Sequence, residues 1–245
     1  MKRHLGQTAV LVVALVSVLT LVACTSAGST QQANTQEETE VVEDLSASKM
    51  PTKIACVGDS ITWGYGVSDT RDTDSYPAQL QALLSDAGYS TQVENYGYNG
   101  ACALSNGKNP YINTQEYVDS LASGADMVII MLGTNDAAST YWDQDSYESE
   151  LGALVEAYQS TASSPTVVLM VSPSIYSTSW AGGVSATKVA QMQQGARDVA
   201  EKYGLSCIDV ANLTDGHADW FEDGVHPNKE GNAEIAQLIF DTLSN

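Results

Sequence analysis

A serine, a histidine and an aspartate in this 245-residue chain have the types and spacing needed for acyl transfer. Ser60 follows an apolar run and a Gly-Asp pair, and its hydroxyl is a poor nucleophile until a base removes its proton. His226 is the favoured base, because Asp223 lies three residues earlier, where a short turn can bring its carboxylate to one imidazole nitrogen. The alternative base, His217, also has aspartates nearby, but it lacks the constrained setting that Pro227 and an expected helix give His226. We therefore expect Ser60, His226 and Asp223 to act as a catalytic triad.

Acyl transfer also requires hydrogen-bond donors aimed at the oxyanion that develops in the transition state. The candidates for this oxyanion hole are the backbone N–H groups of Ser60 and Gly100 and the side-chain amide of Asn135. Gly100 has no side chain, so its backbone can approach a substrate closely, and Gly97 is a rival for the same role. Gly100 and Asn135 are alternatively plain turn residues. The neighbouring Asp136 is interpreted as structural, because the histidine already has a correctly spaced acid.

Four segments resemble, in order, the signature blocks of the SGNH (GDSL-type) hydrolase superfamily. They are Gly58-Asp59-Ser60, Gly100, the Gly-Thr-Asn-Asp segment at 133–136 and the Asp-Gly-Val-His segment at 223–226. Ile61 stands where the GDSL name has Leu, a swap of similar volume. The resemblance implies a three-layer, flavodoxin-like α/β/α sandwich and metal-free hydrolysis of carboxylic esters. It leans toward removal of O-acetyl groups from carbohydrates, with a lysophospholipase or thioesterase acting on longer acyl chains as the alternative.

The elements that must position these residues follow a regular alternation of apolar runs and helical patterns. Strands are expected at 53–57, 92–95, 127–132, 166–171 and 205–210, and helices at 77–87, 115–123, 147–160, 186–203 and 228–243. This alternation predicts an α/β fold with a five-stranded parallel sheet and right-handed crossovers. Sites in open α/β sheets lie beyond the carboxyl ends of the strands. The four segments are therefore expected to meet at one edge of the sheet.

The first fifty residues are typical of an export and anchoring segment. Lys2 and Arg3 precede an apolar run over 9–23, which indicates a signal peptide over 1–23 and is too short for a membrane span. Cys24 follows Leu-Val-Ala in a pattern similar to a bacterial lipobox, which implies cleavage before Cys24 and lipidation of its thiol. The alternative is an ordinary signal peptide with a chance cysteine. Residues 24–50 are rich in Ser, Thr, Gln and Glu and predict a disordered tether, so the hydrolase domain is expected over 51–245. The expected location is extracytoplasmic, with the lipoprotein anchored to the cell membrane.

The composition argues against several classes of partner. The formal net charge is −20, with 10 Lys and Arg against 30 Asp and Glu, so binding to nucleic acid through phosphates is not expected. Membrane contact is expected only through the lipid on Cys24. The chain has no CxxC pair and one well-placed histidine, so neither a metal nor another cofactor is expected. The expected partner is a small ester or acetylated glycan substrate, and the oligomeric state stays open.

The remaining cysteines leave two further alternatives. After Cys24 there are three, an odd number that requires at least one free thiol. Cys56 and Cys207 lie in apolar runs and are expected to be buried. Cys102, two residues past Gly100, allows a thiol enzyme, but no histidine is obviously assigned to it. A non-enzymatic solute-binding lipoprotein is the alternative from another class, although such receptors usually need a second lobe that nothing in the sequence marks.

Overall fold

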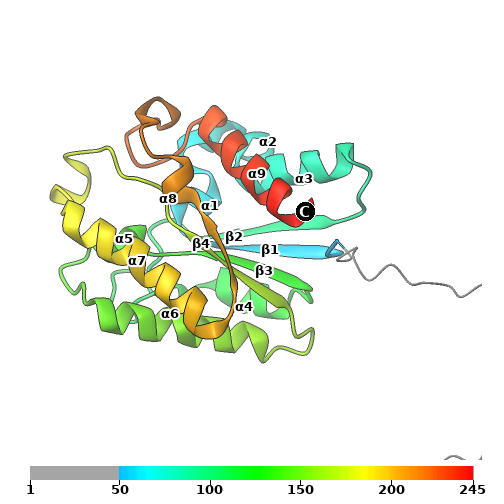
Figure 1. The fold of residues 1–245 in the computed structure, drawn as a ribbon, viewed down its shortest axis with the longest axis horizontal. Helices are drawn as coiled ribbons and strands as arrows, with labels where there is room; N and C mark the ends of the chain where they lie inside the picture. Colours follow the sequence, from blue (N-terminus) through cyan, green and yellow to red (C-terminus); the bar gives the residue numbers. More distant parts are fainter. Residues whose placement is uncertain (1–49, 245) are drawn as a thin grey trace, which may run out of the picture. The chain divides into compact units, whose positions relative to one another are not determined.

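Five parallel strands form the centre of the computed structural model, which describes residues 50–244 (Figure 1). The strands are β1 (Lys53–Gly58), β2 (Gln92–Gly97), β3 (Met127–Met131), β4 (Thr166–Val171) and β5 (Ser206–Asp209). They pair side by side in the order β2-β1-β3-β4-β5, and every pair is parallel. The predicted α/β sandwich with a five-stranded parallel sheet is confirmed.

Five longer helices cover the two faces of the sheet (Figure 1). One face carries α3 (Tyr76–Asp86) and α9 (Lys229–Ser244), which pack against each other. The other face carries α4 (Gln115–Ala122), α6 (Gln144–Gln159) and α7 (Ala186–Tyr203). Helix α6 begins three residues before the predicted start, because the side chain of Asp143 accepts a hydrogen bond from the N–H of Ser146 and caps the first turn.

The continuously apolar central strands supply both cores. Along β3, Val128 and Ile130 point to the cluster under α6 and α7, and Ile129 and Met131 point to the cluster under α3 and α9. This follows from the alternation of side chains along a strand that is covered on both faces. Burying each such side chain contributes about 1.5–3 kcal/mol. The sheet is therefore a rigid platform for the loops at its carboxyl edge.

Several short helices in the connections between the strands and the longer helices were not predicted. They are α1 (Ser60–Trp63), α2 (Arg71–Asp74), α5 (Thr134–Ala138) and α8 (Val210–Leu213), with 3₁₀ turns η1 (Tyr65–Thr70), η2 (Tyr111–Asn113), η3 (Trp180–Gly182) and η4 (Ala218–Trp220). The expected loop after β1 is thus helical from its first residue. A single turn is too short to show an apolar period, so hydrophobic patterning does not detect it.

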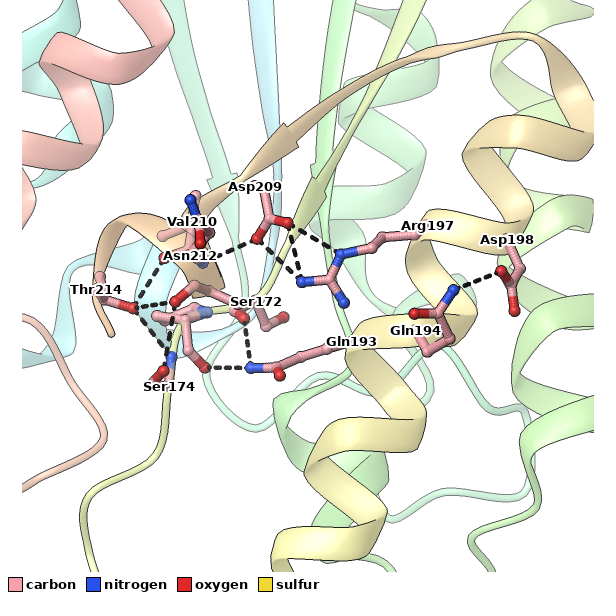
Figure 2. A network of polar contacts seen from close by, with 12 residues as sticks. Ser172, Ser174, Gln193, Gln194, Arg197, Asp198, Asp209, Val210, Asn212 and Thr214 are labelled. Carbon is pink, nitrogen blue, oxygen red and sulfur yellow. Dashed lines mark hydrogen bonds and ion pairs between the residues drawn. The ribbon is translucent and has the colours of Figure 1, made fainter. Parts of the chain in front are cut away.

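A polar network ties α7 to the ends of β4 and β5 (Figure 2). Arg197 of α7 donates from Nε to Oδ2 of Asp209 at 2.9 Å and from Nη2 to Oδ1 at 3.2 Å. Gln193, one turn earlier, donates to the carbonyl of Ser172 just after β4 at 3.3 Å. Bidentate Arg–carboxylate pairs are geometrically specific. Both ends of the connection from β4 to α7 are consequently held against the sheet.

The three later cysteines are free thiols, and their burial differs from strand to strand. Cys56 in β1 and Cys102 after β2 are buried, but Cys207 in β5 is exposed. The prediction of a buried Cys207 was wrong. The reason is that β5 is an edge strand in which Ile208 faces the core under α9, while the side chains on either side of it stay accessible.

The predicted signal peptide over 1–23, the lipidation site Cys24 and the tether as far as residue 49 lie outside the described residues. Within 50–244, no helix combines the length and the apolar character that crossing a bilayer requires.

Candidate active site

Side chains from all four predicted segments meet at the carboxyl edge of the sheet. Ser60 opens α1 after β1, Gly100 follows β2 and Asn135 lies in α5 after β3. Asp223 and His226 lie between η4 and α9, in the connection that follows β5. Hydrogen bonds join Ser60 to His226 and link Asn135 to the loop that carries Gly100.

A tight turn from strand to helix places Ser60. Asp59 is the N-cap of α1, and its Oδ1 accepts the N–H of Ile61 at 2.8 Å. Gly58 makes the turn possible, because a Cβ there would lie 2.1 Å from Oγ1 of Thr62 and 2.6 Å from the carbonyl oxygen of Met131. Ser60 is 6 % exposed, so its hydroxyl is held in a defined place at the first position of the helix.

Ser60, His226 and Asp223 form a continuous hydrogen-bonded chain. Oγ of Ser60 lies 2.9 Å from Nε2 of His226, and Nδ1 of His226 lies 2.7 Å from Oδ2 of Asp223. The other oxygen, Oδ1, accepts the N–H groups of Val225 and His226 at 3.0 and 2.8 Å. Gly224 allows this turn with a φ of +80°. The three residues therefore have the mutual geometry of a nucleophile, a base and the acid that orients the base.

Asp223 is ionised in this setting. Partial burial acts to raise the pKa of the carboxyl, but the backbone and ring hydrogen bonds from His226 and the N–H of Val225 outweigh it. The pKa of Asp223 consequently lies below its usual value. An ionised carboxylate on Nδ1 fixes the tautomer that leaves Nε2 free to accept the proton of Ser60.

Asn135 contacts the residues next to Ser60 and Gly100 in the sequence. Its Nδ2 donates to the carbonyl of Ala101 at 3.0 Å and lies 3.4 Å from Oδ2 of Asp59. Both neighbours are acceptors, so they define which end of the amide is the nitrogen. Gly100 has a φ of +80°, which favours glycine.

Gly97, the rival of Gly100, is otherwise engaged. Its N–H donates to Oδ1 of Asn95 at 2.9 Å. A Cβ on Gly97 would lie 2.2 Å from the backbone nitrogen of Trp63, so this glycine allows α1 to pack on β2. The geometry favours Gly100 as the backbone donor.

Two further aspartates are buried beneath the donors. Asp136 accepts the N–H groups of Ala103 and Leu104 at 3.0 and 2.8 Å and so fixes the loop after Gly100. Burial raises the pKa of Asp136 to about 6 despite these bonds. Burial likewise raises the pKa of Asp59 to about 7, against the hydrogen bond from Ile61 and with a smaller contribution from the charge of Asp136.

Tyr65 contacts the site and was not predicted from the sequence. Its ring centroid lies 4.6 Å from that of His226, at an interplanar angle of 43°. Gly66 brings η1 this close, because a Cβ there would lie 2.3 Å from the carbonyl oxygen of Pro227. The clustering of aromatic residues and glycines after Ser60 was the one available signal, but it carries no information on a contact 161 residues away in sequence.

The competing candidates lie in other settings. The ring of His217 stacks on Trp220 with ring centroids 3.8 Å apart, and the backbone N–H of His217 donates to the hydroxyl of Tyr176. Cys102 is buried, and burial raises the pKa of its thiol to about 11, which disfavours the thiolate needed by a thiol enzyme. In the described part of the chain, no three His, Cys, Asp or Glu side chains are grouped as metal ligands.

A cavity of ≈ 520 Å³ opens beside the two candidate oxyanion donors. Gly100 and Asn135 form part of its wall, together with residues of the loops at 106–109 and 138–141 and with Trp180 of η3. We call it the donor-side cavity. It lies within the size range of pockets that hold small organic ligands, about 300–1,000 Å³.

Comparison with known proteins finds the same family from sequence and the same fold from structure. The profile of the GDSL-like Lipase/Acylhydrolase family matches residues 56–234. An acetylxylan esterase from Xylanibacter ruminicola is 32% identical over a 208-residue alignment that covers 76% of this chain and 42% of that protein. The chain thus spans less than half the length of this relative.

Solved structures with the same fold share little sequence with this chain. A lipase/acylhydrolase from Enterococcus faecalis has a TM-score of 0.64 at 21% identity, covering 78% of this chain and 95% of that one. An acetylxylan esterase from Geobacillus stearothermophilus has a TM-score of 0.62 at 20% identity, and the match covers 79% of this chain and 94% of that one.

Proposed function

Because this chain belongs to the GDSL-like Lipase/Acylhydrolase family, and is by that membership a carboxylic-ester hydrolase, we propose that it removes O-acetyl groups from carbohydrates. The proposed catalytic residues are Ser60, His226 and Asp223. The observation that carries the proposal is the chain of contacts from Oγ of Ser60 to Nε2 of His226, 2.9 Å, and from Nδ1 of His226 to Asp223, 2.7 Å.

In the first half of the reaction, Nε2 of His226 takes the proton of Ser60 while Oγ bonds to the acyl carbon. The carbonyl oxygen becomes an oxyanion, which accepts hydrogen bonds from the N–H groups of Ser60 and Gly100 and from Nδ2 of Asn135. Asp223 stabilises the imidazolium without itself taking the proton. His226 then gives the proton to the leaving alkoxide, and an acetyl ester remains on Ser60.

In the second half, water enters where the alcohol has left. His226 takes a proton from this water as its oxygen bonds to the acyl carbon, and the same donors hold the second oxyanion. Collapse of the intermediate breaks the bond to Oγ of Ser60, which regains its proton from His226. The products are acetate and the deacetylated sugar, and the residues return to their starting states.

The choice of an acetylated sugar rests on the relatives and on the walls of the site. The similar protein from Xylanibacter ruminicola is an acetylxylan esterase. The loops around the donors carry Tyr, Trp, Asn and Ser, side chains that suit polyols by stacking and hydrogen bonding.

Specificity constants for p-nitrophenyl acetate, butyrate and octanoate test the acyl preference. Each methylene buried in an acyl pocket favours the longer ester by about 0.8 kcal/mol, so the series reports the depth of that pocket. We expect acetate to be the best of the three. A specificity constant at least tenfold higher for octanoate than for acetate would instead identify a hydrolase of longer acyl chains.

We propose in addition that a lipid on Cys24 anchors the enzyme to the outer side of the cell membrane, with residues 25–50 as a tether. The support is the sequence alone. Cys24→Ala should release the protein into the medium or periplasm while ester hydrolysis is retained. If Cys24→Ala stays in the membrane fraction, the anchor is an uncleaved signal segment.

A further inference from the structure

The donor-side cavity is far larger than the group that the proposed reaction removes. An acetyl group adds a single methyl beyond the acyl carbon, while the cavity measures ≈ 520 Å³ and includes the donors Gly100 and Asn135. A ligand that fills it therefore contacts Gly100 and Asn135, next to the proposed triad, and is more than an acetyl group.

Two aromatic side chains from separate loops form the outer wall of this cavity. Tyr141 comes from the loop between α5 and α6 and is 64% exposed, and Trp180 comes from η3 in the connection between β4 and α7. The same cavity is lined by Asn106, Asn109 and Thr140, which offer amide and hydroxyl groups. Aromatic faces combined with such groups match a sugar ring, which has apolar C–H faces and a hydroxyl rim.

The two loops are tied to the same helix. Nζ of Lys188 in α7 donates to the carbonyl of Ser139 at 2.9 Å, and Nε1 of Trp142 donates to Oε1 of Gln191 in α7 at 3.2 Å. The connection that carries Trp180 runs directly into α7, whose polar network fixes it to β4 and β5 (Figure 2). The loop that carries Tyr141 is thus bonded to α7, and the connection that carries Trp180 continues into the same helix.

The charges in the wall also suit an uncharged ring. Although the chain has 30 Asp and Glu against 10 Lys and Arg, the residues around the donor-side cavity include Lys108 and no carboxylate. No acidic group in this wall opposes the oxyanion or competes for its donors. A fatty acyl chain would need a continuous aliphatic wall, whereas the aliphatic side chains here are those of Ala138 and Ala181.

We propose that the donor-side cavity is a glycan subsite in which Tyr141 and Trp180 hold a neutral sugar ring of the acetylated substrate. This rests on the proposed function, since it specifies where that substrate binds. The subsite makes Tyr141 and Trp180 determinants of specificity for saccharide esters over simple aryl esters.

The test compares two substrates across four variants. Trp180→Ala and Tyr141→Ala should each lower kcat/KM for O-acetylated xylotetraose about tenfold more than for p-nitrophenyl acetate, mainly through KM. Trp180→Phe, which keeps an aromatic face, should retain most of the kcat/KM that Trp180→Ala loses. The control is Tyr89→Ala, because Tyr89 is another surface-exposed tyrosine, in the turn before β2 at the opposite edge of the sheet. It should leave both constants unchanged.

Binding to the unreactive Ser60→Ala protein separates this inference from the proposed function. Xylotetraose should quench or shift the tryptophan fluorescence of Ser60→Ala, and adding Trp180→Phe should abolish the change while calorimetry still detects binding. Equal decreases in kcat/KM for both substrates, or a decrease confined to p-nitrophenyl octanoate, would overturn the glycan subsite. Either result would leave the proposed esterase activity unchanged. Absence of p-nitrophenyl acetate hydrolysis by the wild-type protein would overturn the proposed function instead.

Discussion

Aspartates near the proposed base His226 and aspartates near the candidate oxyanion donors have pKa values shifted in opposite directions. On the side of the base, Asp223 is partly exposed and its pKa is lowered by hydrogen bonds from His226 and Val225 that outweigh the effect of burial. On the side of the oxyanion donors, Asp59 and Asp136 are fully buried, and burial raises their pKa values to about 7 and about 6. Environment, not residue identity, thus separates an ionised aspartate from aspartates that hold their protons up to near-neutral pH.

This difference matches the charges that each side must accommodate. In the proposed reaction, a positive imidazolium forms beside Asp223, and a carboxylate there stabilises it. In the same reaction a negative oxyanion forms beside Asn135, and a carboxylate at Asp59, 3.4 Å from Nδ2, would oppose it unless protonated. The fold therefore supplies a charge where a cation develops and raises the cost of a charge where an anion develops.

Removal of the nucleophile or the base should have the largest effect. Ser60→Ala or His226→Ala should lower kcat for p-nitrophenyl acetate by about 10⁶-fold, and the double variant should be little worse, because the two act as a unit. His217→Ala is the matched control and should change kcat by less than about threefold, since this ring stacks on Trp220. An inactive His217→Ala would reassign the base.

Neutralising the acid on the base side should come next. Asp223→Asn keeps the shape but presents an amide to Nδ1 of His226, so the wrong tautomer is favoured and kcat should fall by about 10⁴-fold. Steady-state kinetics with folding checked by circular dichroism measures this. A loss below tenfold would mean that another group orients the ring.

Loss of a donor should cost less than loss of the acid. Asn135→Ala should lower kcat by about 10²–10³-fold with a smaller change in KM, because an oxyanion donor acts in the transition state. Asn135→Asp is the informative companion, since it replaces the donor with an acid and should be at least as damaging. Unchanged turnover in Asn135→Ala would reduce this residue to a structural part of α5.

How much of this was predictable depends on the sequence distance of each contact. The sequence alternates strands and helices, which predicts a parallel sheet. Because parallel strands bring their carboxyl ends together, the motifs that follow the strands predicted Ser60, Asn135 and His226 at one edge. Asp223 was predictable from its local spacing to His226. These inferences need only periodicity and short-range turns.

Contacts between distant segments were not predictable in the same way. The ring of Tyr65 lies on His226, and Asp59 lies near Asn135, in each case through packing of separate elements. The burial that shifts the pKa of Asp59 leaves no local pattern. Cys207 shows the converse error, because an apolar run does not reveal that its strand lies at an edge.

The smallest effect on turnover is expected for Asp59→Asn, which should change kcat by less than about tenfold yet alter stability in a pH-dependent way. The pKa of an aspartate is about 3.9 when unfolded, and that of Asp59 is about 7 when folded. Between these values the folded state holds a proton that the unfolded state has released, so stability falls as pH rises. Asparagine cannot ionise and keeps an acceptor for the N–H of Ile61.

Calorimetry of Asp59→Asn checks the sign. The Tm of the variant should match that of the wild-type protein near pH 4 and exceed it near pH 8. The Tm should rise by about 2–4 °C for each kcal/mol gained in the free energy of unfolding. Asp223→Asn should instead be less stable than the wild-type protein above about pH 4 and approach it only at lower pH, because the lowered pKa of Asp223 contributes stability that is present above the unfolded pKa of about 3.9 and lost as pH falls through the folded one. Parallel curves for the two variants would remove the distinction between the two sides.

Covalent labelling with a serine-directed phosphonate, mapped by mass spectrometry, tests the triad most directly. We expect one adduct per chain, on the peptide that contains Ser60, with labelling that is lost in Ser60→Ala and slowed strongly in His226→Ala but not in His217→Ala. Labelling on another residue, or labelling of Ser60 that is indifferent to His226, would contradict it.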